Sequence, residues 1–378
     1  MTARKDTNTV SIAVVGCGRI AGHHCRSIAA ADGAEIVAVC DLVESKAREY
    51  GDAFGIPVFT DYREMLDSVP GIDIVVVATP SGMHYEHAAE IIETYEKHVV
   101  VEKPTFMRPS QFLSASALAE RHGVNLYPVF QNRYNTAVDR VRRALRSGEL
   151  GTIRIMTVRV RWCRPQRYYD LAPWRGTLSH DGGALTNQGI HHVDLLRHLG
   201  GEVEAVNTTM RTLGAEIEAE DTVVSTLRFA NGAVGTLEVT TSARPDDFEA
   251  SVSIVGSEGL AQLGGIAVNE LQIFTPNPSA CAENSENFVG IKGHGAVYGY
   301  GHYAMYRDIM ANLADGTPYP VAGEDALATL RLLHAFYRSD EAGGWVDVGV
   351  EDESPRLGRV NEAVSALYRT PPRQATAR

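Results

Sequence analysis

The turn from Gly16 to Ala21 has the spacing Gly-x-Gly-x-x-Ala of a dinucleotide-binding fingerprint. It follows a predicted strand and opens a predicted helix, which is the context that this fingerprint requires. Gly16 permits a tight turn, Gly18 lets backbone amides approach a pyrophosphate, and Ala21 keeps the helix close to the strand. We therefore expect a nicotinamide dinucleotide to bind here. A glycine-rich turn without a ligand is the alternative.

Asp41 ends the next apolar run, 25 residues after Gly16. A carboxylate at this point can accept both ribose hydroxyls of an adenosine. Its negative charge repels a 2′-phosphate, and Leu42 and Val43 supply no guanidinium to neutralise one. These residues favour NAD over NADP. The alternative is an aspartate that only caps the following helix.

Glu102-Lys103-Pro104 follows the apolar run Val99–Val101, at the carboxyl end of a predicted parallel strand. Open α/β sheets place their ligands at this edge. A partly buried lysine there has its pKa lowered toward neutrality and can exchange a proton with a substrate hydroxyl. The alternative is an ordinary surface lysine.

The segment from Asp181 to Asp194 is rich in glycine, amide and histidine side chains. If a helix starts at residue 185, Asn187 and His191 stand four residues apart on one face and reach into one cleft, whereas His192 and Asp194 point elsewhere. The His-His-x-Asp pattern suggests a metal site, but no other His or Cys group supplies the further ligands that zinc needs. We therefore expect no metal. Histidines that cap a helix are the alternative.

The residues from 10 to about 131 alternate short β-branched runs with amphipathic stretches, which is typical of βα repeats around a parallel sheet. Crossover handedness then favours a Rossmann-type, doubly wound α/β fold. The expected strands are Ile12–Val15, Ile36–Cys40, Ile74–Ala78, Val99–Val101 and Asn125–Phe130. The expected helices are Ala21–Ala31, Ser45–Phe54, Tyr62–Leu66, Glu86–Tyr95 and Gln111–His122.

After a helix expected at Arg133–Leu145, the chain predicts an α+β unit with a large, open, mainly antiparallel sheet. Asn231-Gly232 is a strong hairpin signal. The expected strands are Ile153–Arg161, Val203–Arg211, Thr222–Phe229, Ala233–Thr241 and Ala250–Val255, and helices are expected from about Thr186, at His302–Ala314 and at Glu324–Arg338. We thus expect a cofactor domain at 1–131, a substrate and oligomerisation domain at 132–368, and a disordered tail at 369–378.

The bulk properties limit the partners. The chain has 378 residues, 44% of them hydrophobic, and a formal net charge of −12. This acidic balance argues against nucleic acid or an anionic membrane as the partner. Five cysteines without a Cys-x-x-Cys pair predict neither a disulfide framework nor a zinc knuckle. Met1 to Thr9 are polar and lack the apolar stretch of a signal peptide, and the sequence has no run of about 18 apolar residues. We expect a cytoplasmic protein.

Three signals occur together: the dinucleotide turn, Glu-Lys-Pro at a strand end, and Gly-Gly-Ala-x-x-Asn-x-x-x-His in the second half. This combination resembles the Gfo/Idh/MocA oxidoreductase family over nearly the whole chain. The resemblance implies catalysis by Lys103 and His191 and assembly as a homodimer or homotetramer. The implied NAD contacts are Gly16, Gly18, Arg19, Ile20, Asp41, Thr79, Pro80, His84, Glu102, Lys103 and Gln131.

Asn187 departs from the family pattern, which often has aspartate at this position. An amide cannot accept a proton as a carboxylate does, so the acid/base role shifts toward Lys103 and His191. Asn187 is then expected to complete the catalytic group by orienting a hydroxyl.

Within the family, the chain resembles the bacterial UDP-N-acetylglucosaminuronate 3-dehydrogenases, which supply a 3-keto sugar for transamination in surface-polysaccharide assembly. The stretches that carry this resemblance are Phe130–Asn135, Arg164–Asp170, Trp174–Gly176, Asn187-Gln188, Ile217–Asp221 and Ala267–Glu270. The arginines and aromatic residues between Trp162 and Arg175 suit an anionic glycan, and an oligomer interface loop is the alternative. The implied substrate contacts are Arg133, Arg164, Gln166, Tyr168, Trp174, Arg175, Asn187 and His191.

Two other functions stay open on the sequence. A dehydrogenase or ketoreductase for another sugar, a sugar phosphate or an inositol predicts activity that is indifferent to UDP. A non-catalytic NAD-bound sensor predicts loss of the lysine or the histidine, yet Lys103 and His191 are both present.

Overall fold

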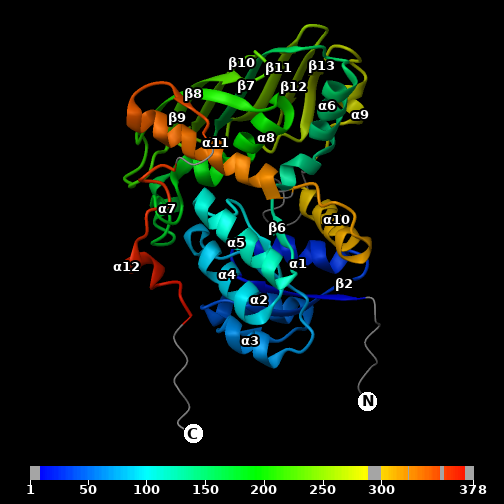
Figure 1. The fold of residues 1–378 in the computed structure, drawn as a ribbon, viewed down its shortest axis with the longest axis vertical. Coiled ribbons are helices and arrows are strands. Elements are labelled where there is room, and N and C mark those ends of the chain that lie inside the picture. Colours follow the sequence, from blue (N-terminus) through cyan, green and yellow to red (C-terminus); the bar gives the residue numbers. More distant parts are fainter. Residues whose placement is uncertain (1–8, 288–298, 322, 350–352, 371–378) are drawn as a thin grey trace.

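Six parallel strands form the N-terminal sheet, in the order β3-β2-β1-β4-β5-β6 (Figure 1). The computed structural model describes residues 9–287, 299–321, 323–349 and 353–370. The strands are β1 (Val10–Val15), β2 (Ala34–Cys40), β3 (Val58–Phe59), β4 (Ile74–Val77), β5 (His98–Val101) and β6 (Leu126–Pro128). The strand order reverses between β1 and β4, so the ligand crevice expected of a doubly wound sheet lies at the carboxyl ends of these two strands.

The helices between these strands lie where the sequence periodicity predicts them. They are α1 (Ala21–Ala30), α2 (Glu44–Phe54), α3 (Tyr62–Ser68), α4 (His84–Tyr95) and α5 (Pro109–His122), and a short 3-10 turn, η1 (Ser81–Met83), precedes α4. Asp61 caps α3 by accepting hydrogen bonds from the backbone amides of Arg63 and Glu64. The two-residue strand β3 is absent from the expected strands because its apolar run is too short to stand out.

The second sheet has eight strands in the order β13-β12-β11-β7-β10-β9-β8-β14. They are β7 (Ile153–Arg161), β8 (Val203–Arg211), β9 (Thr222–Phe229), β10 (Val234–Thr240), β11 (Glu249–Gly256), β12 (Leu260–Gly264), β13 (Glu270–Phe274) and β14 (Val346–Asp347). The β7–β10 pair is parallel and the other pairs are antiparallel. The predicted open, mainly antiparallel sheet is confirmed, and Asn231-Gly232 makes the β9–β10 turn with Gly232 at φ +87°.

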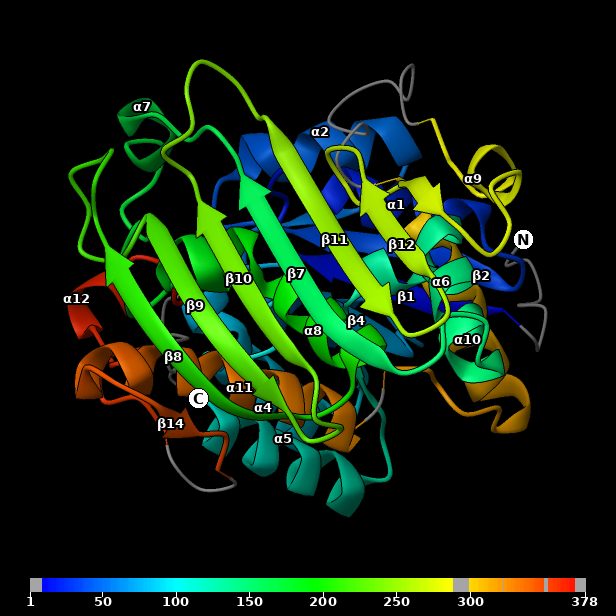
Figure 2. The same cartoon turned by 90° about the horizontal axis from the view of Figure 1, so that it is seen from above.

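Helices cover one face of this sheet. Figure 2 shows the strands in front, with α8 (Ile190–Gly200) and α11 (Gly323–Ala342) behind them, on the side of the N-terminal sheet. The remaining short elements are η2 (Gln131–Tyr134), α6 (Thr136–Ser147), α7 (Gln166–Tyr169), η3 (Ala184–Gln188) and α9 (Ala280–Glu283). Along the strands, exposed and buried residues alternate, as expected for a sheet with one open face.

The C-terminal part of the chain returns to the N-terminal unit. Helix α10 (Gly301–Asp315) packs on α1 (Figure 1), and α12 (Glu362–Ser365) lies near the C-terminal end. Arg369 and Thr370, expected in a disordered tail, are instead anchored, because Arg369 pairs with Glu86 and Thr370 is buried. Residues 371–378 of that predicted tail lie outside the described residues. Among the described residues, no helix combines the length and apolarity needed to cross a bilayer.

Candidate active site

The loop between β1 and α1 forms a tight turn that packs on the end of β4. Gly16 has a φ of +98°, and a Cβ atom there would lie 2.5 Å from the backbone of Ala78. Glycine is therefore required at this position. A Cβ atom at Gly18 would meet none of the described atoms within 4 Å. This open space at the start of α1, where backbone amides lack helical partners, fits the pyrophosphate of a dinucleotide.

Alanine substitutions at these two glycines separate folding from cofactor binding. Gly16→Ala is expected to lower the free energy of unfolding by about 1–3 kcal/mol, because it imposes a positive φ and a backbone clash. Gly18→Ala is expected to change it by less than about 0.5 kcal/mol but to weaken NAD binding about tenfold, by filling the open space. Urea denaturation of the NAD-free protein and calorimetric titration with NAD measure the two effects. Wild-type NAD affinity in Gly18→Ala would place the pyrophosphate elsewhere.

Asp41 lies directly after β2 and beside this turn. Its carboxylate accepts hydrogen bonds from the backbone amides of Cys17 at 2.9 Å and Val43 at 2.8 Å. These bonds fix a negative charge next to the glycine turn, where it suits ribose hydroxyls and repels a 2′-phosphate. The side chains of Leu42 and Val43 are exposed and bring no positive charge, as NAD rather than NADP requires.

Lys103, Asn187 and Asp181 form a partly buried chain of hydrogen bonds. Lys103 Nζ donates to the backbone oxygen of Asn187 at 2.8 Å and to its Oδ1 at 3.4 Å. Asn187 Nδ2 donates to Asp181 Oδ1, and Asp181 Oδ2 accepts from the amide of Gly176 at 2.7 Å. Both amide atoms of Asn187 are thus used within the protein. Asn187 thus links Lys103 to Asp181, and its expected role of orienting a substrate hydroxyl stays a prediction.

Burial dominates the electrostatics of this chain. It lowers the pKa of the Lys103 ammonium, which the charges of Glu102 and Asp181 raise and those of Arg175 and Arg164 lower further. Burial raises the pKa of Asp181 to about 6. A lysine in this environment can lose its proton more easily than a surface lysine and so act as a base on a hydroxyl.

Asn187 lies on a π-helical turn rather than on the regular helix that the sequence predicts. The turn η3 closes with a bond from the amide of Gly189 to the carbonyl oxygen of Ala184, and α8 starts only at Ile190. Glu220 fixes the start of η3, because its backbone oxygen accepts from the Ala184 amide at 2.9 Å and its Oε1 from the Leu185 amide at 3.0 Å. Such π-turns occur frequently at functional sites.

His191, the second predicted catalytic residue, lies on the first turn of α8. Its Nε2 accepts a hydrogen bond from Gln131 Nε2 at 3.1 Å, and no partner of its Nδ1 is found among the described residues. Burial, and then the Lys103 charge, lower the pKa of His191 well below its ordinary value, so the ring is neutral. A neutral ring with Nε2 as acceptor carries its proton on Nδ1, which is then available to a ligand oxygen.

Arginines and aromatic rings stack in the loop at residues 162–175, which precedes η3. The guanidinium of Arg175 lies 4.3 Å from the ring centroid of Tyr168 and 4.7 Å from that of Trp174, and its Nη1 donates to the Tyr168 hydroxyl at 2.5 Å. Arg164 stacks on Tyr168 from 5.6 Å and pairs with Asp247. This loop therefore brings two cations close enough to Lys103 to lower its pKa.

Comparison with known proteins identifies the family. Residues 10–130 match an oxidoreductase family with an NAD-binding Rossmann fold, and residues 138–262 match the GFO/IDH/MocA C-terminal domain. The WlbA dehydrogenase from Bordetella pertussis, crystallised with NADH and UDP-GlcNAcA, is 36% identical, with a TM-score of 0.84 over 91% of this chain and 99% of that one. The chain belongs to the Gfo/Idh/MocA oxidoreductase family. Its N-terminal Rossmann unit is the NAD-binding part of this oxidoreductase.

Two further relatives extend the comparison. The WlbA dehydrogenase from Chromobacterium violaceum, also crystallised with NADH and UDP-GlcNAcA, is 33% identical, with a TM-score of 0.81 over 93% of this chain and 99% of that one. The myo-inositol 2-dehydrogenase of Thermotoga maritima is 26% identical over 87% of this chain and 96% of its own length. These relatives thus include dehydrogenases crystallised with a nucleotide sugar and one named for a polyol substrate.

Some predicted ligand contacts of this Gfo/Idh/MocA chain have hydrogen-bond partners within the protein. The buried guanidinium of Arg133 pairs with Asp194 through Nε and Nη2 and with Asp325 through Nη1. Gln166 joins two loops, because its Oε1 accepts from the Glu216 amide at 2.7 Å and its Nε2 donates to Asp170 at 2.9 Å. These polar groups already have partners within the protein, and the predicted substrate roles of Arg133 and Gln166 stay predictions.

Two predicted cofactor contacts, His84 and Glu102, also bond within the protein and stay predictions. His84 has its Nδ1 2.9 Å from the carbonyl oxygen of Pro104 and its Nε2 2.8 Å from that of Thr79, so it ties together the loops after β4 and β5. The carboxylate of Glu102 contacts His24, His302 and the amide of Lys103. Through these contacts, His84 and Glu102 hold the loop that carries Lys103. The remaining predicted contacts, among them Arg19, Ile20, Thr79 and Pro80 for NAD, stay predictions.

Asp181, His24 and His302 escape the sequence-based prediction. Asp181 is buried, and its place in the Gly-Gly segment that the sequence singles out is the signal that could have found it. His24 lies on the cofactor helix α1, and His302 comes from α10, nearly 280 residues later. No local spacing links residues so far apart, so their meeting depends on the packing of α10 against α1.

Proposed function

We propose that this Gfo/Idh/MocA oxidoreductase oxidises the 3-hydroxyl of a UDP-linked N-acetylated amino uronate to the 3-keto sugar, with NAD as the hydride acceptor. The observation that carries the proposal is the likeness to two WlbA dehydrogenases, at 36% and 33% identity over almost their full lengths. Both were crystallised with UDP-GlcNAcA. A 3-keto product has the carbonyl that transamination requires, which suits a step in polysaccharide or related sugar biosynthesis.

The hydrogen-bonded chain of Lys103, Asn187 and Asp181 supports the proton chemistry. NAD supplies the acceptor for the hydride that leaves C3 of the sugar. Neutral Lys103 takes the proton of the 3-hydroxyl as the carbonyl forms, and its Nζ becomes an ammonium that donates to the two oxygens of Asn187. Neutral His191 donates from Nδ1 to an oxygen of the sugar, while Gln131 holds its Nε2. The protein thereby positions the hydroxyl and moves its proton.

The charges around the site support an anionic substrate. Burial raises the pKa of the Tyr168 hydroxyl, and the charges of Arg175, Arg164 and Arg19 lower it. Positive charges from the loop and from the glycine turn therefore lie near one ring. The carboxylate and pyrophosphate of a nucleotide uronate are acceptors that guanidinium groups bind well. A free inositol carries no such charge.

A second candidate is a dehydrogenase for a free sugar or inositol. It is favoured by the likeness to myo-inositol 2-dehydrogenase over most of both chains. The catalytic group Lys103, Asn187 and His191 would serve either substrate. The arginines of the preceding loop favour the nucleotide sugar.

A substrate panel tests the proposal. UDP-linked amino uronates, their neutral UDP-sugar counterparts, free sugars and inositols are each offered with NAD and with NADP, and nicotinamide absorbance is followed. We expect turnover with the UDP-linked uronate and NAD, and much less with the neutral UDP-sugar. A response confined to free polyols would refute the nucleotide-sugar assignment and support the second candidate.

Assembly as a homodimer or homotetramer through the open face of the eight-stranded sheet is part of the proposal. Ile155, Val224 and Val234 are exposed on this sheet, and Val234 pairs in register with Ile155. Exposed apolar side chains on neighbouring strands are typical of a subunit interface. The cytoplasmic location stays a prediction from the sequence.

A further inference from the structure

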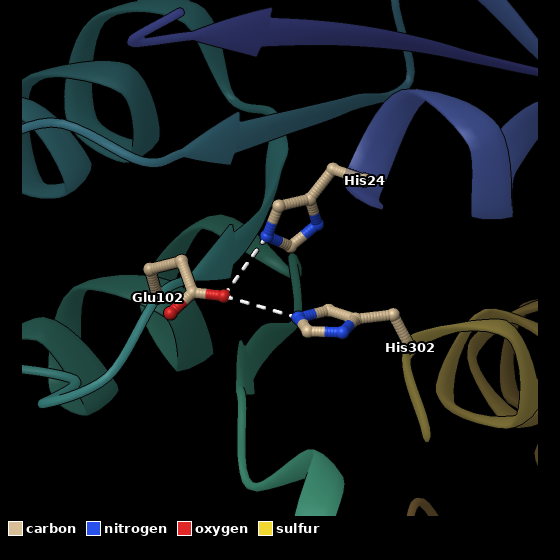
Figure 3. A group of neighbouring side chains, drawn as sticks. All are labelled: His24, Glu102 and His302. Atoms are coloured by element: carbon tan, nitrogen blue, oxygen red, sulfur yellow. Dashed lines mark hydrogen bonds and ion pairs between the residues drawn. The ribbon is translucent and has the colours of Figure 1, made fainter. Parts of the chain in front are cut away.

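Three buried side chains from distant parts of the chain meet directly behind Lys103. Figure 3 shows the rings of His24 and His302 pointing at one carboxylate oxygen of Glu102. His24 Nε2 lies 3.0 Å from Glu102 Oε1, and His302 Nε2 lies 3.3 Å from the same atom. The other carboxylate oxygen, Oε2, accepts from the backbone amide of Lys103 at 2.9 Å. We call His24, Glu102 and His302 the carboxylate cluster.

The cluster connects three parts of the fold at the catalytic lysine. His24 lies on α1, the helix that follows the dinucleotide loop, and Glu102 follows β5. His302 lies on the first turn of α10, where Gly301 packs so closely that a Cβ atom would lie 2.3 Å from the backbone oxygen of Gln131. Tyr306, one turn further along α10, places its hydroxyl 2.7 Å from His24 Nδ1. Helix α10 is therefore part of the wall of the active site.

The proton positions in the cluster follow from these contacts. A neutral His24 can donate from Nε2 to Glu102 while its Nδ1 accepts from the Tyr306 hydroxyl, and a neutral His302 can donate from Nε2. Each short distance is then occupied by one proton. Two histidines and a carboxylate are also side chains of the types that bind zinc. Because protons account for both contacts of Glu102 Oε1, the structure favours a hydrogen-bonded cluster.

We propose that His24 and His302 are positioning residues that hold Glu102 as a buried anion behind Lys103, and that this anion sets the pH range in which Lys103 takes up a hydroxyl proton. The inference rests on the base role of Lys103 in the proposed function. A buried carboxylate persists as an anion only where donors replace its lost hydration. The two imidazoles and the Lys103 amide are those donors.

The charges around the cluster support this role. Burial alone would raise the pKa of Glu102, but the hydrogen bonds from His24 and His302 bring it well below the ordinary range. In turn, the Glu102 charge raises the pKa of Lys103 against the effect of burial. The other titratable or charged groups around these two residues are His23, His84, Arg164, Arg175, Asp181, His191 and Tyr306.

Paired substitutions of His302 and Glu102 test the inference. His302→Leu removes one donor, so Glu102 is expected to take up a proton near neutral pH, and Glu102→Gln removes the charge outright. Both changes remove the negative charge of Glu102, which raises the pKa of Lys103. The acidic limb of the kcat against pH profile should therefore move to lower pH by about one unit. His302→Gln keeps an amide donor and should keep the wild-type profile. His198→Leu, a histidine among Arg133, Arg142 and Asp325 and outside the cluster, should leave the profile unchanged.

A second measurement separates this inference from the proposed function. The rate at which a small acylating reagent labels Lys103 in NAD-free protein, read by mass spectrometry across pH, reports the lysine without any substrate. We expect the midpoint to fall in Glu102→Gln and His302→Leu, even if the UDP-uronate is not turned over. An unchanged midpoint in Glu102→Gln would overturn the inference. Stoichiometric zinc in the purified wild-type protein would also overturn it, because a metal ion would replace the protons of the cluster.

Discussion

Replacing Lys103 by methionine is expected to lower kcat by about 10²–10⁴-fold, the range that a positioned general acid or base contributes. Methionine keeps the length and burial of the side chain but cannot accept a proton. Asp41 bonds to the amides of Cys17 and Val43 whereas Lys103 bonds to Asn187, so NAD binding should stay near its wild-type value. Steady-state kinetics with the best substrate of the panel and fluorescence titration with NADH measure the two quantities.

The matched control is Lys97→Met, which removes a lysine between α4 and β5. This variant should keep both kcat and NADH affinity. Turnover of Lys103→Met at the wild-type rate would remove Lys103 as the base. A parallel loss of NADH binding would instead assign the lysine to cofactor binding.

The N-terminal fold follows from local sequence signals. The strands around Val14, Val76 and Val100 are β-branched runs buried on both faces, and such runs can be recognised in the sequence alone. The turn at Gly16 is equally local, because its positive φ and its close approach to Ala78 require glycine. For the same reason Asp41 and Lys103 could be placed correctly at strand ends. The predicted doubly wound parallel sheet is confirmed.

The geometry around Asn187 could not be predicted from spacing alone. A regular helix from residue 185 would put Asn187 and His191 on one face, but Glu220 binds the amides at the start of the segment and a π-turn forms. Glu220 is buried with a pKa raised to about 8, and it lies on a loop more than 30 residues further along the chain. Tertiary contacts of this kind override local helical preference.

The roles of the polar residues were harder to predict than their location. Arg133 lies close to the site in sequence and in space, yet its guanidinium is neutralised by Asp194 and Asp325. A buried arginine needs such partners, and the sequence does not show which carboxylates will reach it. By contrast, Arg175 stacks on Tyr168 and Trp174 as the composition of its loop suggests.

Asp181→Asn is expected to lower kcat by about 10–100-fold, with little change in NAD affinity. Asp181 accepts the amide proton of Asn187 and thereby turns Asn187 Oδ1 toward Lys103 Nζ. An asparagine at 181 removes the charge that raises the pKa of Lys103. It also leaves the side-chain amide of Asn187 free to rotate, because the acceptor that fixes its orientation is lost. A positioned charge of this kind is typically worth a few kcal/mol in a buried site. The kcat against pH profile should therefore move to lower pH as its maximum falls.

The double variant Asp181→Asn/Asn187→Asp is the matched control, because it moves the carboxylate by one hydrogen bond and conserves the total charge. Position 187 is where the family often has aspartate, and there the carboxylate would contact Lys103 Nζ directly. We expect it to regain most of the lost kcat and to shift the acidic limb back toward higher pH. Equal losses in the single and double variants, with both folded, would show that shape rather than charge at Asp181 matters. Wild-type turnover of the single variant would remove Asp181 from the site altogether.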